Sequence, residues 1–241
     1  MESFEPGQEA SRTLVSGPSM FVFRDVEGSF PTKWTGVWRP PYKLLDYVSY
    51  RVNGQWLTGN NLTSVQTGTK DRRTHLLDSL RATEITAPKD GGISEHLLIE
   101  NDTSEPKAIT IAMEVGVDIR HQSQDLGPNK YDTNYKDTEL VFSSSEQSLT
   151  LESEGFSLEG NEKTKEHFPD ERQRALVPPK LRFNRTVGPE SSTETEVHIS
   201  TAPPEDAPPP SIHTAETEFS AAEGHAAREL EKLCFGTRGR G

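Results

Sequence analysis

The stretch ISEHLLIENDTSEPKAITIAMEVGVD (residues 93–118) decides the fold class of this 241-residue chain. It contains two runs in which apolar and polar residues alternate, Ile93–Glu100 and Ala108–Asp118, and a polar loop at 101–107 joins them. Because every second residue of the second run is apolar, one face of that strand is buried and the other is solvated. The apolar residues are Ile109, Ile111, Met113, Val115 and Val117. The stretch therefore predicts a hairpin of an antiparallel sheet.

Shorter runs of the same kind occur along most of the chain. Phe21–Arg24, Leu44–Val52 and Ser79–Ile85 alternate, and Asn53-Gly54 supplies the two residues of a hairpin turn. Weaker strand patterns cover residues 64–69, 140–142, 149–151, 156–158, 176–187 and 193–201. Many short strands separated by turn residues are typical of two packed sheets. We therefore predict an all-β fold, a large antiparallel β-sandwich.

Composition divides the chain into four parts. Residues 1–12 are expected to be disordered, and residues 13–201 are expected to form the sandwich domain. Residues 202–214 are rich in proline and predict a stiff, extended linker. Residues 215–241 predict one amphipathic helix followed by a glycine-rich tail. The apolar residues at helical spacing are Phe219, Ala222, Ala226, Leu230 and Leu233.

Charge and residue usage narrow the function classes. The chain has 26 Lys and Arg against 38 Asp and Glu, a formal net charge of -12, which argues against binding nucleic acid or an anionic membrane. A single cysteine, Cys234, rules out a disulfide within the chain and a cysteine-rich zinc site. The seven histidines do not pair at ligand spacing, so no metal and no cofactor are expected. Without a signal peptide or a membrane-spanning run, a cytoplasmic location is predicted.

The sequence contains no phosphate-loop, GxGxxG, HExxH or GxSxG motif, and carboxylates are the main candidates for chemistry. Glycoside hydrolysis uses a pair of them. Carboxylates near the aromatic segment or on predicted strands are Asp25, Glu27, Asp46, Glu95 and Glu100. Because most Asp and Glu side chains are exposed in proteins, these residues are expected to be solvated charges or turn residues.

All three tryptophans lie in GSFPTKWTGVWRPPYKLLDYVSYRVNGQWL (residues 28–57). Their flat faces could stack on sugar rings, or they could pack in the core or against another domain. Packing is the favoured interpretation because large aromatic side chains dominate cores and interfaces. Trp34, Trp38, Arg39 and Trp56 are the residues we expect at a substrate-facing or interface-facing surface.

Three ordered segments resemble the N-terminal domain of the glycogen debranching enzyme (amylo-alpha-1,6-glucosidase) family. They are FVFRDVEGSF (21–30), GVWRPPYKLLDYVSYRVNGQWL (36–57) and ISEHLLIENDTSEPKAITIAMEVGVDI (93–119). Each segment alone is ordinary hairpin sequence, and their order carries the resemblance, which covers about residues 15–120. Matching positions include Asp25, Gly28, Gly36, Trp38, Asp46, Asn53, Gly54, Glu95, Asn101, Pro106 and Asp118.

The resemblance implies a supersandwich-like β-sandwich that packs on a catalytic (α/α)6 barrel, which hydrolyses α-1,6 linkages in glycogen or another α-glucan. The family's catalytic acids have no counterpart in this chain, whose residues 215–234 resemble the segment leading toward the barrel. We therefore expect a non-catalytic domain that shapes one side of a glucan cleft, with the barrel as a separate domain or subunit. The alternatives are an autonomous carbohydrate-binding module and a structural sandwich that mediates protein contacts.

Overall fold

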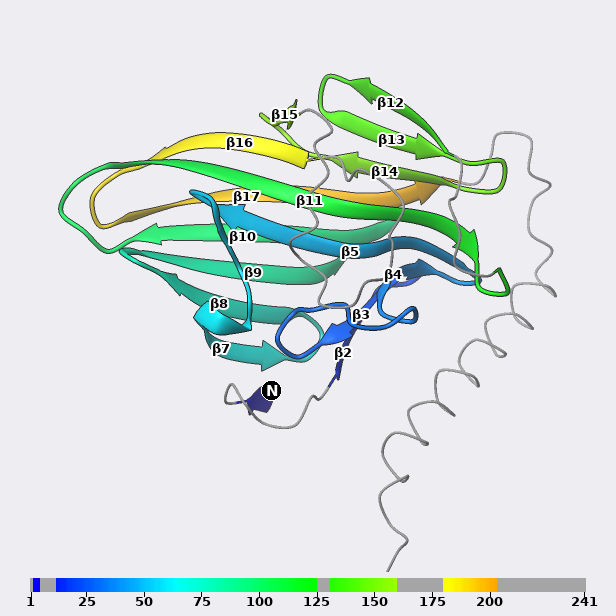
Figure 1. The fold of residues 1–241 in the computed structure, drawn as a ribbon, viewed down its shortest axis with the longest axis horizontal. Coiled ribbons are helices and arrows are strands. Elements are labelled where there is room, and N and C mark those ends of the chain that lie inside the picture. The colour runs from blue at the N-terminus through cyan, green and yellow to red at the C-terminus, as the bar shows by residue number, and fades with distance from the viewer. Residues whose placement is uncertain (1, 5–11, 125–130, 160–179, 203–241) are drawn as a thin grey trace, which may run out of the picture.

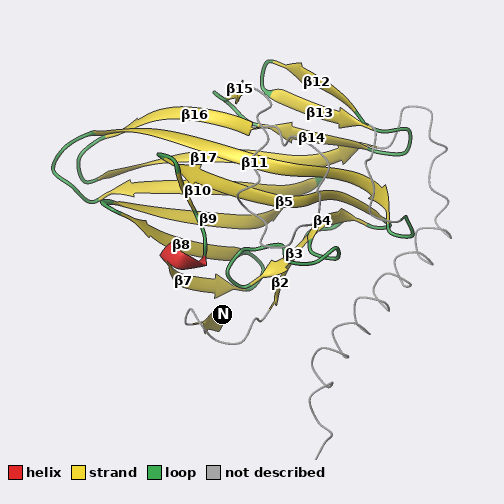
Figure 2. Cartoon of the chain, viewed as in Figure 1, coloured by secondary structure: helices red, strands yellow, loops and turns green. Residues whose placement is uncertain are grey.

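A computed structural model describes residues 2–4, 12–124, 131–159 and 180–202. Within these ranges the chain is almost entirely strand, and its one helical element is a 3-10 turn, η1 (Gly59–Asn61). Two large sheets lie face to face, and every strand pair in them is antiparallel (Figures 1 and 2). The predicted antiparallel β-sandwich is confirmed. The predicted linker beyond residue 202 and the predicted C-terminal helix lie outside the described residues.

The nine-stranded sheet is centred on a ten-residue strand, Gly92–Asn101, which pairs along its whole length with a neighbour on each side. In spatial order the strands are β1 (Glu2–Phe4), β7 (Leu62–Thr67), β8 (Asp71–Leu77), β9 (Leu80–Lys89), β10 (Gly92–Asn101), β17 (Ser191–Ala202), β14 (Ser148–Glu152), β13 (Glu139–Ser143) and β12 (Asp132–Lys136).

The eight-stranded sheet is built around the pairing of its two longest strands, β11 and β5. In spatial order the strands are β15 (Ser157–Glu159), β16 (Lys180–Val187), β11 (Lys107–His121), β5 (Tyr42–Val52), β4 (Gly36–Arg39), β3 (Phe21–Asp25) and β2 (Arg12–Ser16), with β6 (Gln55–Trp56) beside β5.

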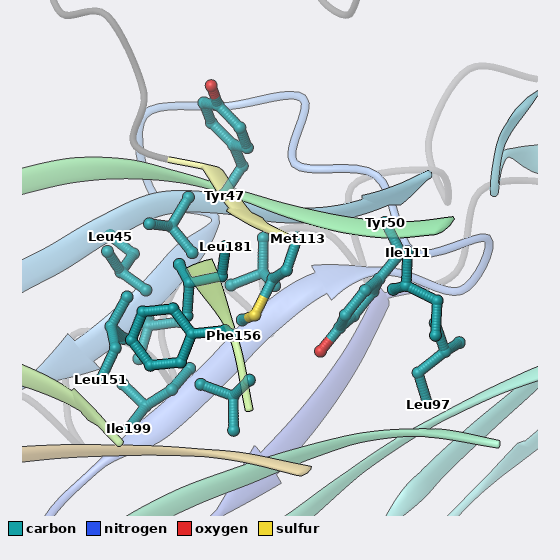
Figure 3. Packing of buried hydrophobic residues seen from close by; sticks show 14 of the residues in the cluster. Leu45, Tyr47, Tyr50, Leu97, Ile111, Met113, Leu151, Phe156, Leu181 and Ile199 are labelled. Carbon is teal, nitrogen blue, oxygen red and sulfur yellow. The ribbon is translucent and has the colours of Figure 1, made fainter. Parts of the chain in front are cut away.

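The core lies between the sheets and follows the alternation that predicted it. The five alternating apolar residues predicted in β11, Ile109 to Val117, are all buried in one cluster with Leu97 and Ile199 of the opposite sheet. Figure 3 shows that side chains of β5 point to both faces of the sheet. Tyr50 points between the sheets, and Tyr47 points to the opposite side. One-sided burial along the strands is what couples strand register to core formation.

The turn between β5 and β6 has the predicted hairpin chemistry. Asn53 and Gly54 both have positive φ, 49° and 83°, as a type I′ turn requires. The Asn53 side-chain oxygen also accepts a hydrogen bond of 2.9 Å from the Thr110 backbone N–H, which ties the turn to β11.

Several strands, among them β4 and β8, occur where the sequence pattern gave none, and two others, β1 and β12, form the ends of the nine-stranded sheet. Residues 1–12, expected to be disordered, contain β1, whose backbone pairs with β7, and the first residue of β2. The polar segment 121–136 contains β12, whose five residues are all exposed. β1 and β12 are both held by backbone pairing at a sheet edge. Such pairing needs no alternation of apolar and polar residues, so sequence analysis does not detect it.

Candidate functional site

A cleft of about 1020 Å³ opens beside β5, where the eight-stranded sheet is interrupted. On this side of β5, β4 pairs with Tyr42–Leu45 and β6 pairs with Arg51 and Val52. Between them, Asp46–Ser49 has no neighbouring strand among the described residues. Side chains of this gap form one wall of the cleft.

Three further segments complete the cleft. They are the loop after β3, the chain from β6 through η1, and the turn between β8 and β9, with Glu84 of β9 at the inner end. The side chains that the cleft offers include three aromatic rings, three carboxylates and several hydroxyl and amide groups. The rings are Phe30, Tyr47 and Trp56; the carboxylates are Glu27, Asp78 and Glu84; the neutral polar groups are Ser29, Ser49, Gln55, Thr58 and Asn61.

Asn61 holds the wall that carries Trp56. Its side-chain amide donates to the Trp56 carbonyl at 2.7 Å, and its Oδ1 accepts from the Thr58 backbone N–H at 3.1 Å. The same Oδ1 lies 2.9 Å from Nδ1 of His75 on β8. Because a carbonyl oxygen only accepts, His75 must donate from Nδ1. The Arg51 guanidinium lies 4.2 Å from the centre of the Trp56 ring and fixes the ring itself.

Arg73, two residues earlier on β8, holds the opposite wall. Its Nε donates to the Val26 carbonyl at 2.8 Å, and its guanidinium pairs with Asp71 at 3.1 Å. Gly28 passes directly over this side chain, with φ of 93°, and a Cβ there would lie 3.1 Å from Arg73 Cδ. Glycine is favoured at this position by the backbone angle, and a side chain there would also have to displace Arg73 by a few tenths of an ångström. Inward-facing residues of one strand therefore position both walls of the cleft.

Glu84 links the cleft to the buried residues behind it. Its carboxylate lines the cleft, and Oε1 lies 4.0 Å from Nε2 of His75. Burial lowers the pKa of His75, although the charge of Glu84 opposes that shift. The lowered pKa favours a neutral His75, which has its proton on Nδ1, beside the Glu84 carboxylate.

A second buried carboxyl group lies deeper between the sheets. Glu95 is fully buried, and the Thr86 hydroxyl lies 2.9 Å from both of its oxygens. Arg24 of the facing sheet donates to the same hydroxyl. Burial raises the pKa of Glu95 to about 7, while the positive charge of Arg24 opposes this shift. Burial also raises the pKa of the Tyr50 hydroxyl well above its usual range.

The four residues predicted at a functional surface do not lie together. Trp56 lines the cleft, whereas Trp34 and Trp38 stack on each other with ring centroids 6.2 Å apart. Trp38 is 7% exposed and also stacks on Phe21, and its indole N–H donates to the Trp34 carbonyl at 2.9 Å. Arg39 donates to the Gln147 side chain at 2.7 Å. The lining of the cleft includes neither of these two tryptophans nor Arg39.

An ionic cluster beside Trp38 has a structural role. Lys43 lies 2.5 Å from Asp46 and donates to the Lys33 carbonyl at 2.9 Å, which anchors the loop that precedes β4. Arg120 pairs with Asp118, whose pKa burial and the neighbouring Asp46 raise to about 6. Because these opposite charges are paired in a nearly dry setting, removing one partner would leave the other buried and unpaired.

The expectation that the acidic residues are solvated is wrong for some of them. Glu95 is fully buried and Asp46 is 9% exposed, whereas Glu27 is exposed and lines the cleft. A sequence signal existed for Glu95, because it alternates with Ile93 and Leu97 on the buried face of β10. Glu84 was not singled out, although it follows Leu80 and Ala82 on the same face of β9. Acidic residues on the inward face of a strand are therefore the ones to expect in buried positions.

The described part of the chain contains no group of three or more His, Cys, Asp or Glu residues placed to hold a metal ion. Nor does any helix in that part have the length and apolarity needed to cross a membrane.

The fold is shared with proteins of known structure. The chain matches no protein-family model and no curated protein. It is similar to a putative aldose 1-epimerase from Escherichia coli K12, with 8% identity and a TM-score of 0.51 over 80% of this chain and 99% of that one. It is also similar to a putative kojibiose phosphorylase from human microbiome, with 9% identity and a TM-score of 0.54 over 89% of this chain. This chain spans 33% of that phosphorylase. At such identities the likeness shows a common fold.

Proposed function

We propose that this chain is a carbohydrate-binding β-sandwich domain and that the cleft beside β5 holds the sugar. The observation that carries the proposal is the lining: the partly exposed Trp56 ring, carboxylates and amide groups converge on one cleft of about 1020 Å³, together with the buried rings of Phe30 and Tyr47. Sugar rings present apolar C–H faces and hydroxyl edges, and a site of this composition meets both. Pockets of this kind, largely formed in advance, are where proteins hold small ligands.

The two similar structures support a sugar ligand. One is named an aldose epimerase and the other a kojibiose phosphorylase, so the same sandwich occurs in proteins named for sugar chemistry. In the phosphorylase the shared region is one part of a longer chain. This agrees with the sequence resemblance to a debranching enzyme and with a partner that carries the catalysis. We infer that the domain packs on an (α/α)6 barrel and presents part of an α-glucan to it.

Binding fits the buried groups better than catalysis does. Opening a sugar ring or hydrolysing a glycosidic bond requires an acid and a base that both reach the reacting atoms. Glu84 reaches the cleft, but Nε2 of His75 has no exposed surface and therefore cannot contact a sugar there. The pair is consequently better placed to hold the cleft in shape than to transfer protons.

Replacement of one tryptophan tests the proposal. Maltotriose titrated into the full chain should bind, and Trp56→Ala should weaken binding about tenfold or more, the cost of removing an aromatic anchor. Trp34→Ala is the matched control because this tryptophan lies outside the cleft lining, and it should leave the affinity unchanged. Isothermal titration calorimetry measures both. Absence of binding at millimolar maltotriose, or an equal loss in the two variants, would contradict the proposal.

The same preparation distinguishes an epimerase. The near-complete coverage of the E. coli protein is the observation that favours this second function. Polarimetry of freshly dissolved α-D-glucose would detect faster mutarotation, which the buried position of His75 argues against. A rate above the buffer rate that Glu84→Gln abolishes would establish the epimerase instead.

A further inference from the structure

The charges around Trp56 are unevenly divided. Trp56 lines two hollows, the cleft and a smaller pocket of about 170 Å³. The smaller pocket has three cationic side chains and one carboxylate, namely Arg51, Lys180, Arg182 and Glu114. The cleft has three carboxylates, and none of its lining residues is Lys, Arg or His. The two hollows that share this ring therefore have opposite charge.

We propose that the cleft selects its sugar by charge: it binds neutral and amino-bearing pyranoses and rejects sugars that carry a phosphate or carboxylate group. The inference rests on the proposed function, since it names the class of sugar that the same cleft takes. It follows from the lining, where Glu27 and Asp78 are exposed at the opening and Glu84 lies at the inner end.

Two cations beside the cleft make contacts outside its lining. Arg73 is fully buried, is shared between Asp71 and the carbonyl groups of Asp25 and Val26, and also attracts Glu84 electrostatically. Arg51 lies over the Trp56 ring and lines the smaller pocket. The lining itself therefore supplies no cation to pair with a ligand phosphate, which would bring its negative charge among three others.

The size of the effect follows from Coulomb repulsion in a partly enclosed site. Like charges repel more strongly where protein replaces water around them, and dissolved salt screens that repulsion over about 10 Å at 0.1 M. A sugar phosphate should therefore bind at least about tenfold more weakly than the same sugar at low salt. An ammonium group should strengthen binding by attraction to the carboxylates and the faces of the aromatic rings.

Three monosaccharides of nearly equal size test the inference. Ligand-observed NMR titrations of D-glucosamine, D-glucose and D-glucose 6-phosphate into the full chain should give affinities in that decreasing order at 10 mM NaCl. The gap between glucose and its phosphate should shrink at 300 mM NaCl. Equal or tighter binding of the phosphate would overturn the charge selection alone. Failure of all three sugars and of maltotriose to bind would overturn the proposed function itself.

A pair of charge-neutralising substitutions tests whether the carboxylates of the cleft, and not the net charge of the protein, cause the discrimination. Glu27→Gln with Asp78→Asn removes two carboxylates from exposed positions, and Asn tolerates the positive φ of 45° at residue 78. This variant should reduce the discrimination against glucose 6-phosphate by severalfold. The matched control, Asp90→Asn with Glu146→Gln, removes two exposed carboxylates outside the cleft and should leave it unchanged. An equal effect in both would contradict the proposal.

Discussion

Strands β8 and β11 both point every second side chain between the sheets, but those side chains differ in kind. The inward residues of β11 are apolar from Ile109 to Val117. Those of β8 are Asp71, Arg73 and His75, and Leu77 is the first apolar one. The same alternation buries apolar side chains that pack the core on β11 and polar side chains that hold loops on β8. The cleft lies beside β8, where the inward face of the nine-stranded sheet becomes polar.

Burying polar side chains costs free energy, and this cost explains where they occur in the fold. Apolar burial stabilises without needing partners, whereas each buried polar group must be hydrogen-bonded or paired. On β8 the partners are the loop carbonyls and side chains that form the cleft walls. A substitution on the inward face of β8 should therefore affect both the stability of the fold and the shape of the cleft. A substitution on the inward face of β11 should affect stability alone.

Arg73 should give the largest effect. Arg73→Met leaves Asp71 buried and unpaired, and removing one partner of a buried ion pair costs about 3–5 kcal/mol. Urea unfolding followed by circular dichroism measures the loss. The double variant Asp71→Leu, Arg73→Met removes both charges and should be more stable than Arg73→Met alone. If the double variant is the less stable one, the ion pair is not what stabilises this region.

Ile111 tests the apolar half of the comparison. Ile111→Ala deletes a fully buried side chain and should lower the free energy of unfolding by about 2–5 kcal/mol. Sugar binding should be unchanged in the folded variant because β11 does not line the cleft. Leu14→Ala, at a residue 49% exposed, is the control and should change stability by less than about 0.5 kcal/mol. A loss of sugar affinity in folded Ile111→Ala would break the separation of core and site.

Glu95 should make stability depend on pH. Its pKa is raised from 4.5 to about 7 in the folded protein, so folding favours the protonated form. This contribution is fully present below about pH 4.5 and is lost as the pH rises through 7, by up to about 3 kcal/mol. Urea unfolding at several pH values should show less of this decline for Glu95→Gln than for wild type. Identical pH profiles would contradict the assignment.

Asn61 should have the smallest effect on stability and a clear one on binding. Asn61→Ala removes the contacts to Trp56, Thr58 and His75 and leaves the buried imidazole without this partner, at a cost of about 1–3 kcal/mol. Because Trp56 loses its anchor, maltotriose affinity should also fall. Asn101→Ala is a matched control, since the Asn101 side chain also donates to backbone carbonyls and lies outside the cleft lining. Unchanged affinity in Asn61→Ala would show that this clamp does not position Trp56.

Alternation of residue types predicted strands with apolar inward faces because it reports one-sided burial directly, and it missed β8, whose buried residues Asp71, Arg73 and His75 are polar. It located β5, β9, β10 and β11, and the Asn53-Gly54 turn follows from local backbone preference. The cleft was harder to predict, because it depends on where β4 and β6 stop pairing with β5. That is a property of three-dimensional register, which no single segment of sequence encodes.

The inward polar residues show a second limit. In β3 the sequence alternates phenylalanine with Val22 and Arg24, and it is Val22 and Arg24 that are buried. Arg24 is tolerated there because Thr86 and the charge of Glu95 face it from the other sheet. Residues far apart in sequence satisfy each other in this way, so hydrophobicity alone assigns the wrong face. Of the four predicted surface residues, Trp56 lines the cleft, and its role in binding stays a prediction.

The indole N–H signals provide the most direct test of the central claim. The chain has three tryptophans, so a ¹H–¹⁵N spectrum of the labelled protein should show three indole signals, which single Trp→Phe variants assign. Titration with maltotriose should shift the Trp56 signal and leave those of Trp34 and Trp38 in place. Shifts confined to Trp34 or Trp38, or no shift at millimolar sugar, would contradict a sugar-binding cleft beside β5.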